Sequence, residues 1–219
     1  MPFAPRVTWP EPRRLPGTAA LALLLTTVAY GNPPPPVELT ETERSRVLAG
    51  KPVFRDTRET PPRAGIAFRV AADEACVWSV IGDLAAYARR VPSLNESSIY
   101  RDDENQTCVR FRASNWLAGT FLYHSCHQFP WPEESWGVFQ LDPEKDNAFA
   151  SASGFWRTET MPADDGTLVY YAAEVSPRGG LARLFRGQLI RRSLKTATQW
   201  LPEAVASGEM PACTETEVD

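Results

Sequence analysis

Apolar and polar side chains alternate over residues 65–70, a period of two that predicts a β-strand. Six later stretches show a similar alternation, and prolines, glycines and aspartates that favour turns separate them. Six consecutive strands joined by short turns favour an antiparallel sheet. The six expected strands cover residues 96–102, 107–113, 120–128, 135–141, 148–159 and 167–175.

Helical spacing follows the first strand and returns near the C-terminus. Asp73 is placed to cap a helix over residues 75–81, and Asp83 to cap a second short helix that ends before Pro92. The C-terminal pattern predicts a long helix from about residue 188. Its apolar positions repeat at intervals of four and three: Ile190, Leu194, Ala197, Leu201 and Ala204.

The first 31 residues look like an export signal. An apolar run over residues 15–29 follows Arg13 and Arg14, and Ala29-Tyr30-Gly31 offers a small-x-small cleavage site. The alternative is an uncleaved N-terminal segment that anchors the chain in a membrane. A Pro-rich linker and lead-in covers residues 32–63, with a short helix that Thr40 and Glu43 start as a capping box.

Export makes disulfides the expected state of the four cysteines. A hairpin centred on Leu117 places Cys108 opposite Cys126, which favours that bridge. The remaining pair, Cys76 and Cys213, would tie the first helix to the C-terminal tail. Zinc held by His124 and the hairpin cysteines is the alternative, but oxidised cysteines are not zinc ligands, so we expect no metal.

The charge and the sequence motifs exclude several classes of function. The 219-residue chain has 23 basic and 27 acidic residues, a net charge of −4, which disfavours a nucleic-acid partner. No motif for a phosphate-binding loop or a nucleophile elbow is present, so we assign neither a cofactor nor catalytic residues. One basic run fits contact with an anionic membrane, or a solvated helix face. It comprises Arg183, Arg186, Arg191, Arg192 and Lys195.

The segment from Val77 to Asp83, followed by Tyr87 and Val91-Pro92, resembles the opening of START-like (SRPBCC) proteins. The branch it resembles most is polyketide cyclase/dehydrase and lipid transport, which includes coenzyme Q-binding proteins. The resemblance covers residues 64–206 and leaves 207–219 as a tail. It implies an α+β helix-grip fold: a curved antiparallel sheet of about seven strands around the long C-terminal helix, with two short helices after strand 1.

The same resemblance implies an apolar cavity between the sheet and the C-terminal helix. Hairpin residues sharing one face, and apolar residues of later elements, are the candidate lining; a filled core is the alternative. Residues 181–186 are a candidate lid over its mouth, or an ordinary helix start. The candidate ligand-binding residues are Val109, Phe111, Phe121, Tyr123, Trp136, Val138, Phe155, Tyr170, Leu184, Phe185, Ile190 and Leu194.

We therefore expect an exported domain that binds a hydrophobic small molecule of the lipid, quinone or sterol class, for carriage or transfer. The alternative is a cyclase- or hydrolase-type enzyme acting on a polyketide-like or aromatic substrate. A third interpretation is a protein-interaction module with a filled core. An ionisable group with a perturbed pKa on the cavity side would favour the enzyme.

Overall fold

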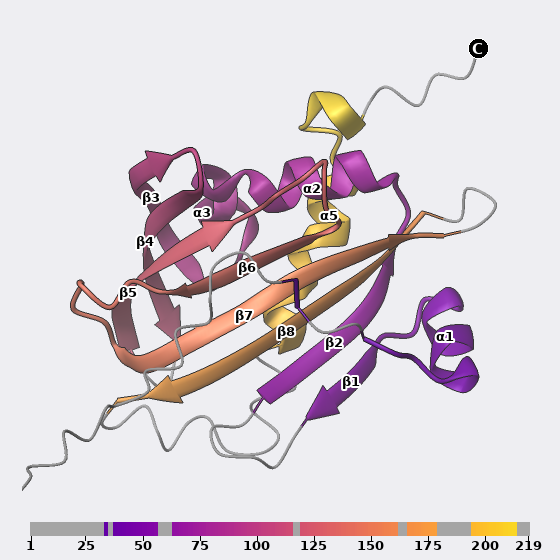
Figure 1. Cartoon of the computed structure of the whole chain (residues 1–219), viewed down its shortest axis with the longest axis horizontal. Coiled ribbons are helices and arrows are strands. Elements are labelled where there is room, and N and C mark those ends of the chain that lie inside the picture. The colour runs from indigo at the N-terminus through magenta and orange to yellow at the C-terminus, as the bar shows by residue number, and fades with distance from the viewer. Residues whose placement is uncertain are drawn as a thin grey trace, which may run out of the picture. The chain divides into compact units, whose positions relative to one another are not determined.

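The computed structural model describes residues 33–34, 37–56, 63–115, 119–161, 166–178 and 194–213. Within these residues the fold is α+β, built on one antiparallel sheet in the order β1-β2-β8-β7-β6-β5-β4-β3. Figure 1 shows this sheet with α1 beside β1 and β2, and with α5 next to α2. The strands are β1 (Val53–Asp56), β2 (Arg63–Val70), β3 (Leu94–Asp103), β4 (Gln106–Asn115), β5 (Gly119–Gln128), β6 (Trp136–Leu141), β7 (Phe149–Thr160) and β8 (Thr167–Pro177).

The expected order of one strand, short helices, six strands and a C-terminal helix is confirmed, with one strand more than predicted. The additional strand is β1, which pairs antiparallel with β2 from Val53 opposite Ala67 to Asp56 opposite Ala64. Four residues are too few for an alternating pattern to stand out in the sequence. The helices are α1 (Glu41–Leu48), α2 (Glu74–Gly82), the 3-10 turn η1 (Leu84–Ala86), α3 (Tyr87–Arg90), α5 (Trp200–Ala206) and the 3-10 turn η4 (Pro211–Cys213).

Two of the three predicted caps are confirmed. Thr40 and Glu43 form a complete capping box at the start of α1, and the Asp73 carboxylate accepts a hydrogen bond from the Cys76 backbone N–H at 2.7 Å. The third prediction is wrong, because the Asp83 side chain makes no capping hydrogen bond to η1. Asp83 instead forms an ion pair with Arg90 at 3.1 Å.

The sheet has a different hydrophobic cluster on each face. The larger cluster joins α2, α3 and α5 to one face, which we call the inner face, and includes Val77, Ile81 and Trp200. The smaller cluster lies on the other, outer face, where Val47 of α1 packs with Leu168 and other residues of the sheet. Residues 194–198 are also helical, and Leu194 is buried there.

Both expected disulfides are present. Cys108 and Cys126 stand opposite each other in the β4–β5 register, as the hairpin centred on Leu117 predicts. The second bridge joins Cys76 of α2 to Cys213 of η4 across a sequence separation of 137 residues. This bridge links η4, the last described element, to α2, which packs on the inner face of the sheet.

Candidate ligand-binding site

A row of aromatic side chains crosses the inner face from β4 to β8. Phe111 and Tyr123 have ring centroids 5.2 Å apart, and His127 stacks on Phe139 at 5.7 Å. Phe139 in turn stacks on the ring of Tyr171 at 5.9 Å. We call the following set the aromatic row: Phe111, Tyr123, His127, Phe139, Trp156 and Tyr171.

Strand register explains why these residues share a face. Side chains on one strand alternate between faces, and directly paired residues on neighbouring strands point to the same side. Phe111 pairs with Tyr123, and His127 pairs with Phe139. The same side belongs to the helices, because the Tyr87 ring of α3 lies 6.0 Å from the Phe111 ring.

Gly154 makes room for the row on β7. It pairs with Phe139, and a Cβ built at Gly154 would overlap the Phe139 ring and the Ala172 backbone oxygen. Any larger residue would therefore displace the Phe139 ring.

His127 is the most unusual polar group on this face. Its side chain is buried, and neither ring nitrogen has a hydrogen-bond partner in the described structure. Burial lowers the pKa of His127 to about 3, so the imidazole is neutral at physiological pH. A buried polar group without a partner costs free energy, and such groups often mark functional sites.

Tyr123 and Tyr171 add two hydroxyl groups to the row. Burial raises the pKa of both phenols, and no hydrogen bond contributes to either shift. Both side chains nevertheless keep some solvent-accessible surface. Other tyrosine hydroxyls are engaged: that of Tyr87 donates to the Ile81 carbonyl oxygen at 2.7 Å, and that of Tyr100 donates to Asp142 at 2.7 Å.

A polar cluster holds the start of α2 against β7, beside the aromatic row. The Trp78 indole N–H donates to Thr158 Oγ1 at 2.8 Å, and the Thr158 hydroxyl donates to the Glu74 carboxylate. Thr160 donates to the other Glu74 oxygen at 2.8 Å. Burial opposes ionisation of Glu74, but hydrogen bonds from Thr158, Ser135 and Thr160 hold its pKa below the usual value.

The residues predicted from the sequence to bind a ligand fall into three groups. Val109, Phe111, Phe121 and Tyr123 belong to the inner face or pack against its core, and Leu194 is buried in the C-terminal helical stretch. The strand register places a second group on the outer face. That group is Trp136, Val138, Phe155 and Tyr170, while Leu184, Phe185 and Ile190 lie outside the described residues.

Four members of the aromatic row were missed by the sequence reasoning. The position of His127 could have been predicted, because it lies four residues after Tyr123 on the same strand and therefore faces the same side of the sheet. Trp156 also had a signal, because the alternate positions Ser153, Arg157 and Glu159 of the same strand are polar. Phe139 and Tyr171 had none, because their strands are largely apolar at both alternating sets of positions.

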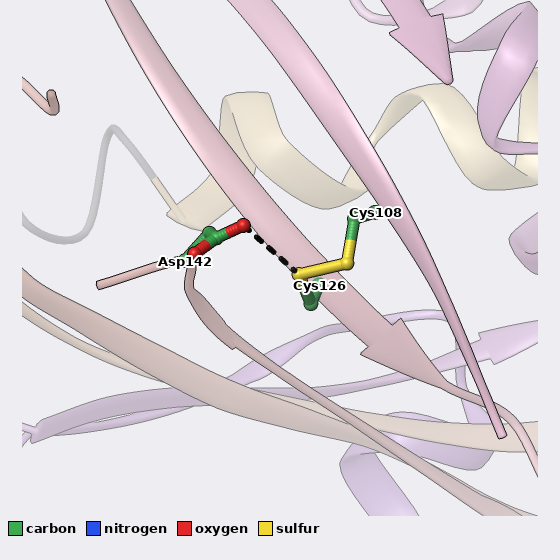
Figure 2. Close-up of side chains that lie close together, drawn as sticks. All are labelled: Cys108, Cys126 and Asp142. Atoms are coloured by element: carbon green, nitrogen blue, oxygen red, sulfur yellow. Dashed lines mark hydrogen bonds between the residues drawn. A yellow bond between two sulfur atoms is a disulfide. The ribbon is translucent and has the colours of Figure 1, made fainter. Parts of the chain in front are cut away.

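The outer side of the β4–β5 hairpin carries a sulfur-containing cluster. Figure 2 shows the Cys108–Cys126 disulfide, with an Asp142 oxygen 3.9 Å from the sulfur of Cys126. The three groups lie within 4.8 Å of one another, as metal ligands would. Joined in a disulfide, however, the sulfurs offer no thiolate, and the third group is Asp142 rather than the His124 considered from the sequence.

Arg101 and Tyr100 complete this cluster. Arg101 Nη2 lies 3.1 Å from the sulfur of Cys108 and 3.8 Å from Asp142. Burial opposes ionisation of Asp142, but the Tyr100 hydroxyl, the Glu144 backbone N–H and the Arg101 charge hold its pKa below the usual value. These contacts satisfy the buried carboxylate, so we assign the cluster to stability of the hairpin.

A comparison with known protein families identifies the family of this chain. The family model described as "Polyketide cyclase / dehydrase and lipid transport" matches residues 70–200, more than half of the chain. The chain belongs to this family. The match spans α2, the strands of the aromatic row and the first residue of α5, so the START-like resemblance of the sequence is confirmed.

Solved structures share the fold at low sequence identity. The Zhui aromatase/cyclase from Streptomyces sp. R1128 is 17% identical with a TM-score of 0.57, over 73% of this chain and 98% of that chain. A STAR-related lipid transfer protein from Xanthomonas axonopodis is 16% identical with a TM-score of 0.55, over 70% and 92%. A START superfamily protein from Mycobacterium smegmatis is 15% identical with a TM-score of 0.54, over 66% and 97%. No curated protein sequence matches the chain.

The predicted membrane and lid features are mostly outside the part of the chain that the structure describes. Lys195 is exposed on the helical stretch 194–198. Among the described helices, none has the length and apolar character needed to span a bilayer. The remaining members of the basic run, Arg183, Arg186, Arg191 and Arg192, and the candidate lid over residues 181–186 lie in undescribed segments.

Proposed function

We propose that this domain binds a hydrophobic small molecule between the inner face of the sheet and the C-terminal helix. The ligand would lie against the aromatic row and be held mainly by burial of its apolar surface. Removing apolar surface from water is the dominant favourable term for such ligands, at about 25 cal/mol per Å². Few polar groups are then needed, and they would orient the ligand.

One observation carries this proposal: the aromatic row combines burial with polar groups whose hydrogen-bonding capacity is unused. Tyr123 and Tyr171 lie deep enough for burial to raise their pKa values, yet both keep accessible surface, and neither hydroxyl has a hydrogen-bond partner among the described residues. A fully packed core would leave neither accessible surface on these rings nor hydroxyls without a partner. The three polar groups of the row, counting His127, therefore suit a site that a ligand completes.

The comparisons support the ligand class. Lipid transfer and aromatase/cyclase proteins share the fold, and the family description names both lipid transport and polyketide chemistry. We favour a lipid, quinone or sterol that the domain carries or transfers. Such transfer would take place at an anionic membrane surface, where Lys195 and the neighbouring basic residues of the sequence would contact headgroups.

We also propose that the protein works after export, in an oxidising compartment. Two disulfides and no free cysteine in the described structure suit that setting, since disulfides are rare in the reducing cytosol. The apolar run after Arg13 and Arg14 would be the signal, with cleavage after Gly31 or retention as an anchor.

Binding is favoured over catalysis by the chemistry of the row. A general base works best when its pKa lies near the working pH. His127, with a pKa of about 3, would be a weak base at neutral pH, and the phenols of Tyr123 and Tyr171 are shifted away from neutrality. These side chains suit hydrogen bonding to a ligand better than proton transfer.

Native mass spectrometry of the full chain, purified without detergent, tests the proposal. We expect a mass increment at one copy per chain, and organic extraction should release a hydrophobic compound of that mass. The complementary measurement is quenching of tryptophan emission by added apolar probes. A protein that carries no compound and shows no quenching with any apolar probe would contradict ligand binding and favour a filled core.

A further inference from the structure

We propose that the ligand is a neutral, ring-containing molecule with a hydroxyl or carbonyl oxygen, and that His127 forms the hydrogen bond that selects this oxygen. This inference rests on the proposed binding function and specifies the chemistry of the same site. It follows from three features of the described residues: the unpaired imidazole, the absence of charged side chains on the same face of the two strands beside it, and the aromatic character of its neighbours.

The imidazole of His127 is held in place but not hydrogen-bonded. Its ring centroid lies 6.1 Å from that of Phe111, 5.7 Å from that of Phe129 and 5.7 Å from that of Phe139. Three phenyl rings fix the orientation of the side chain, while neither nitrogen finds a partner. A neutral imidazole has one donor and one acceptor nitrogen, so it can accept from a hydroxyl or donate to a carbonyl.

The surroundings of His127 disfavour a charged ligand. On strands β2 and β4–β8, no described position on the inner face carries Asp, Glu, Lys or Arg. On β3, Asp102 shares this face, but it is exposed and accepts a hydrogen bond from the Thr107 hydroxyl at 2.6 Å. Two charged groups of the packed helices are engaged: Glu74 with Thr158 and Thr160, and Arg90 with Asp83. An ionised headgroup buried here would lack a counter-charge, which is costly.

The side chains beside His127 favour rings over flexible chains. Phe139 and Tyr171 lie nearly parallel, with an interplanar angle of 13°, and both keep accessible surface. Rigid aromatic side chains offer a large contact area, and aromatic pairs gain stability beyond their buried area. Together with His127 they form a surface on which an aromatic ligand gains both contact and one hydrogen bond.

Three probes with the same ring frame test the proposal on the full chain: anthracene, anthrol and anthracene carboxylate, titrated by tryptophan fluorescence at neutral pH. We expect anthrol to bind about fivefold more tightly than anthracene, the gain of one net hydrogen bond. The carboxylate should bind at least about tenfold more weakly than anthrol. Equal affinities for anthrol and anthracene, or tightest binding of the carboxylate, would overturn the proposal.

The His127→Phe variant assigns the hydrogen bond to this residue. It keeps an aromatic ring and removes both nitrogens, so the ratio of the affinities for anthrol and anthracene should fall from about five to about one, whatever the absolute affinities. His124→Phe is the matched control, because His124 lies on the same strand and faces the other side of the sheet. A preference for anthrol that survives in His127→Phe overturns the assignment.

A measurement on the unmodified protein covers the case in which His127→Phe does not fold. Nitrogen NMR of histidine-labelled protein should show one imidazole whose resonances move with anthrol and stay in place with anthracene. Resonances that respond alike to both probes would overturn the role of His127. Failure of the underlying binding function looks different, because then none of the three probes would bind the wild-type chain.

Discussion

His127 of β5 and Phe139 of β6 are direct cross-strand partners, and their rings stack with centroids 5.7 Å apart and planes 28° apart. This pair fixes the orientation of β6. Phe139 faces the helices, and therefore Val138 and Trp136 face the other side. The strand thus offers a ligand one aromatic side chain in the middle of the row, next to the unpaired imidazole.

Replacing Phe139 should weaken binding where replacing its neighbour does not. We expect Phe139→Ala to reduce the affinity for anthracene by about tenfold, because a buried aromatic contact is lost. Val138→Ala, on the outer face of the same strand, should change it by less than about twofold. Fluorescence titration of both variants measures the difference. Equal losses would show that the site does not use the inner face of β6.

Much of the fold was predictable because its signals are local. The capping box of Thr40 and Glu43 and the hairpin register that pairs Cys108 with Cys126 each follow from a few neighbouring residues. The aromatic hairpin pair of Phe111 and Tyr123 follows from the same register. Alternation is informative there because the outer side of this hairpin carries Arg110 and other polar residues exposed to water.

The orientation of the later strands was not predictable, because both of their faces are covered. Tyr170 and Leu168 pack under α1, and residues before α1 add to that layer: Leu39 packs against the cluster and Arg157 donates to the Pro34 carbonyl oxygen at 3.2 Å. A strand buried on both faces is apolar throughout and loses its period of two. The sequence of β8 therefore contains no physical signal that separates Tyr170 from Tyr171.

Acidification should destabilise the protein through His127. The folded state holds this imidazole neutral, with a pKa of about 3, whereas the unfolded chain protonates it near the ordinary value of 6.5. Between these two values the unfolded state binds more protons, so the free energy of unfolding falls as pH decreases, by up to about 1.4 kcal/mol per pH unit. Urea unfolding between pH 7 and pH 4 measures this slope.

The His127→Phe variant should lose less stability than wild type over the same pH range, because it has no buried imidazole to protonate. His124→Phe is expected to keep the wild-type slope, since His124 lies on the outer side of β5 and is only half-buried. Carboxylates add to the acid sensitivity of all three proteins equally, and the comparison removes their contribution. Identical slopes for wild type and His127→Phe would contradict the buried, neutral imidazole.

The two disulfides should contribute unequally to stability. Cys76 and Cys213 close a loop of 137 residues, and Cys108 and Cys126 one of 18 residues. In the chain-entropy model the longer loop gains more from closure, about 5 kcal/mol against about 3 kcal/mol. Replacing each pair by alanine and measuring unfolding in denaturant tests this order. A larger loss from the hairpin pair would point instead to the contacts that Arg101 and Asp142 make around it.

Thr158 should matter more to stability than Thr160, although both donate to Glu74. Thr158 is buried and also accepts the indole N–H of Trp78 at 2.8 Å, whereas Thr160 is exposed. Thr158→Val keeps the shape and removes the hydroxyl that accepts from the buried Trp78 nitrogen, which costs about 1–3 kcal/mol. Thr160→Val should cost less than about 1 kcal/mol, because water replaces the lost hydroxyl. Denaturant unfolding of the two variants compares them directly, and equal costs would mean that water reaches the indole nitrogen.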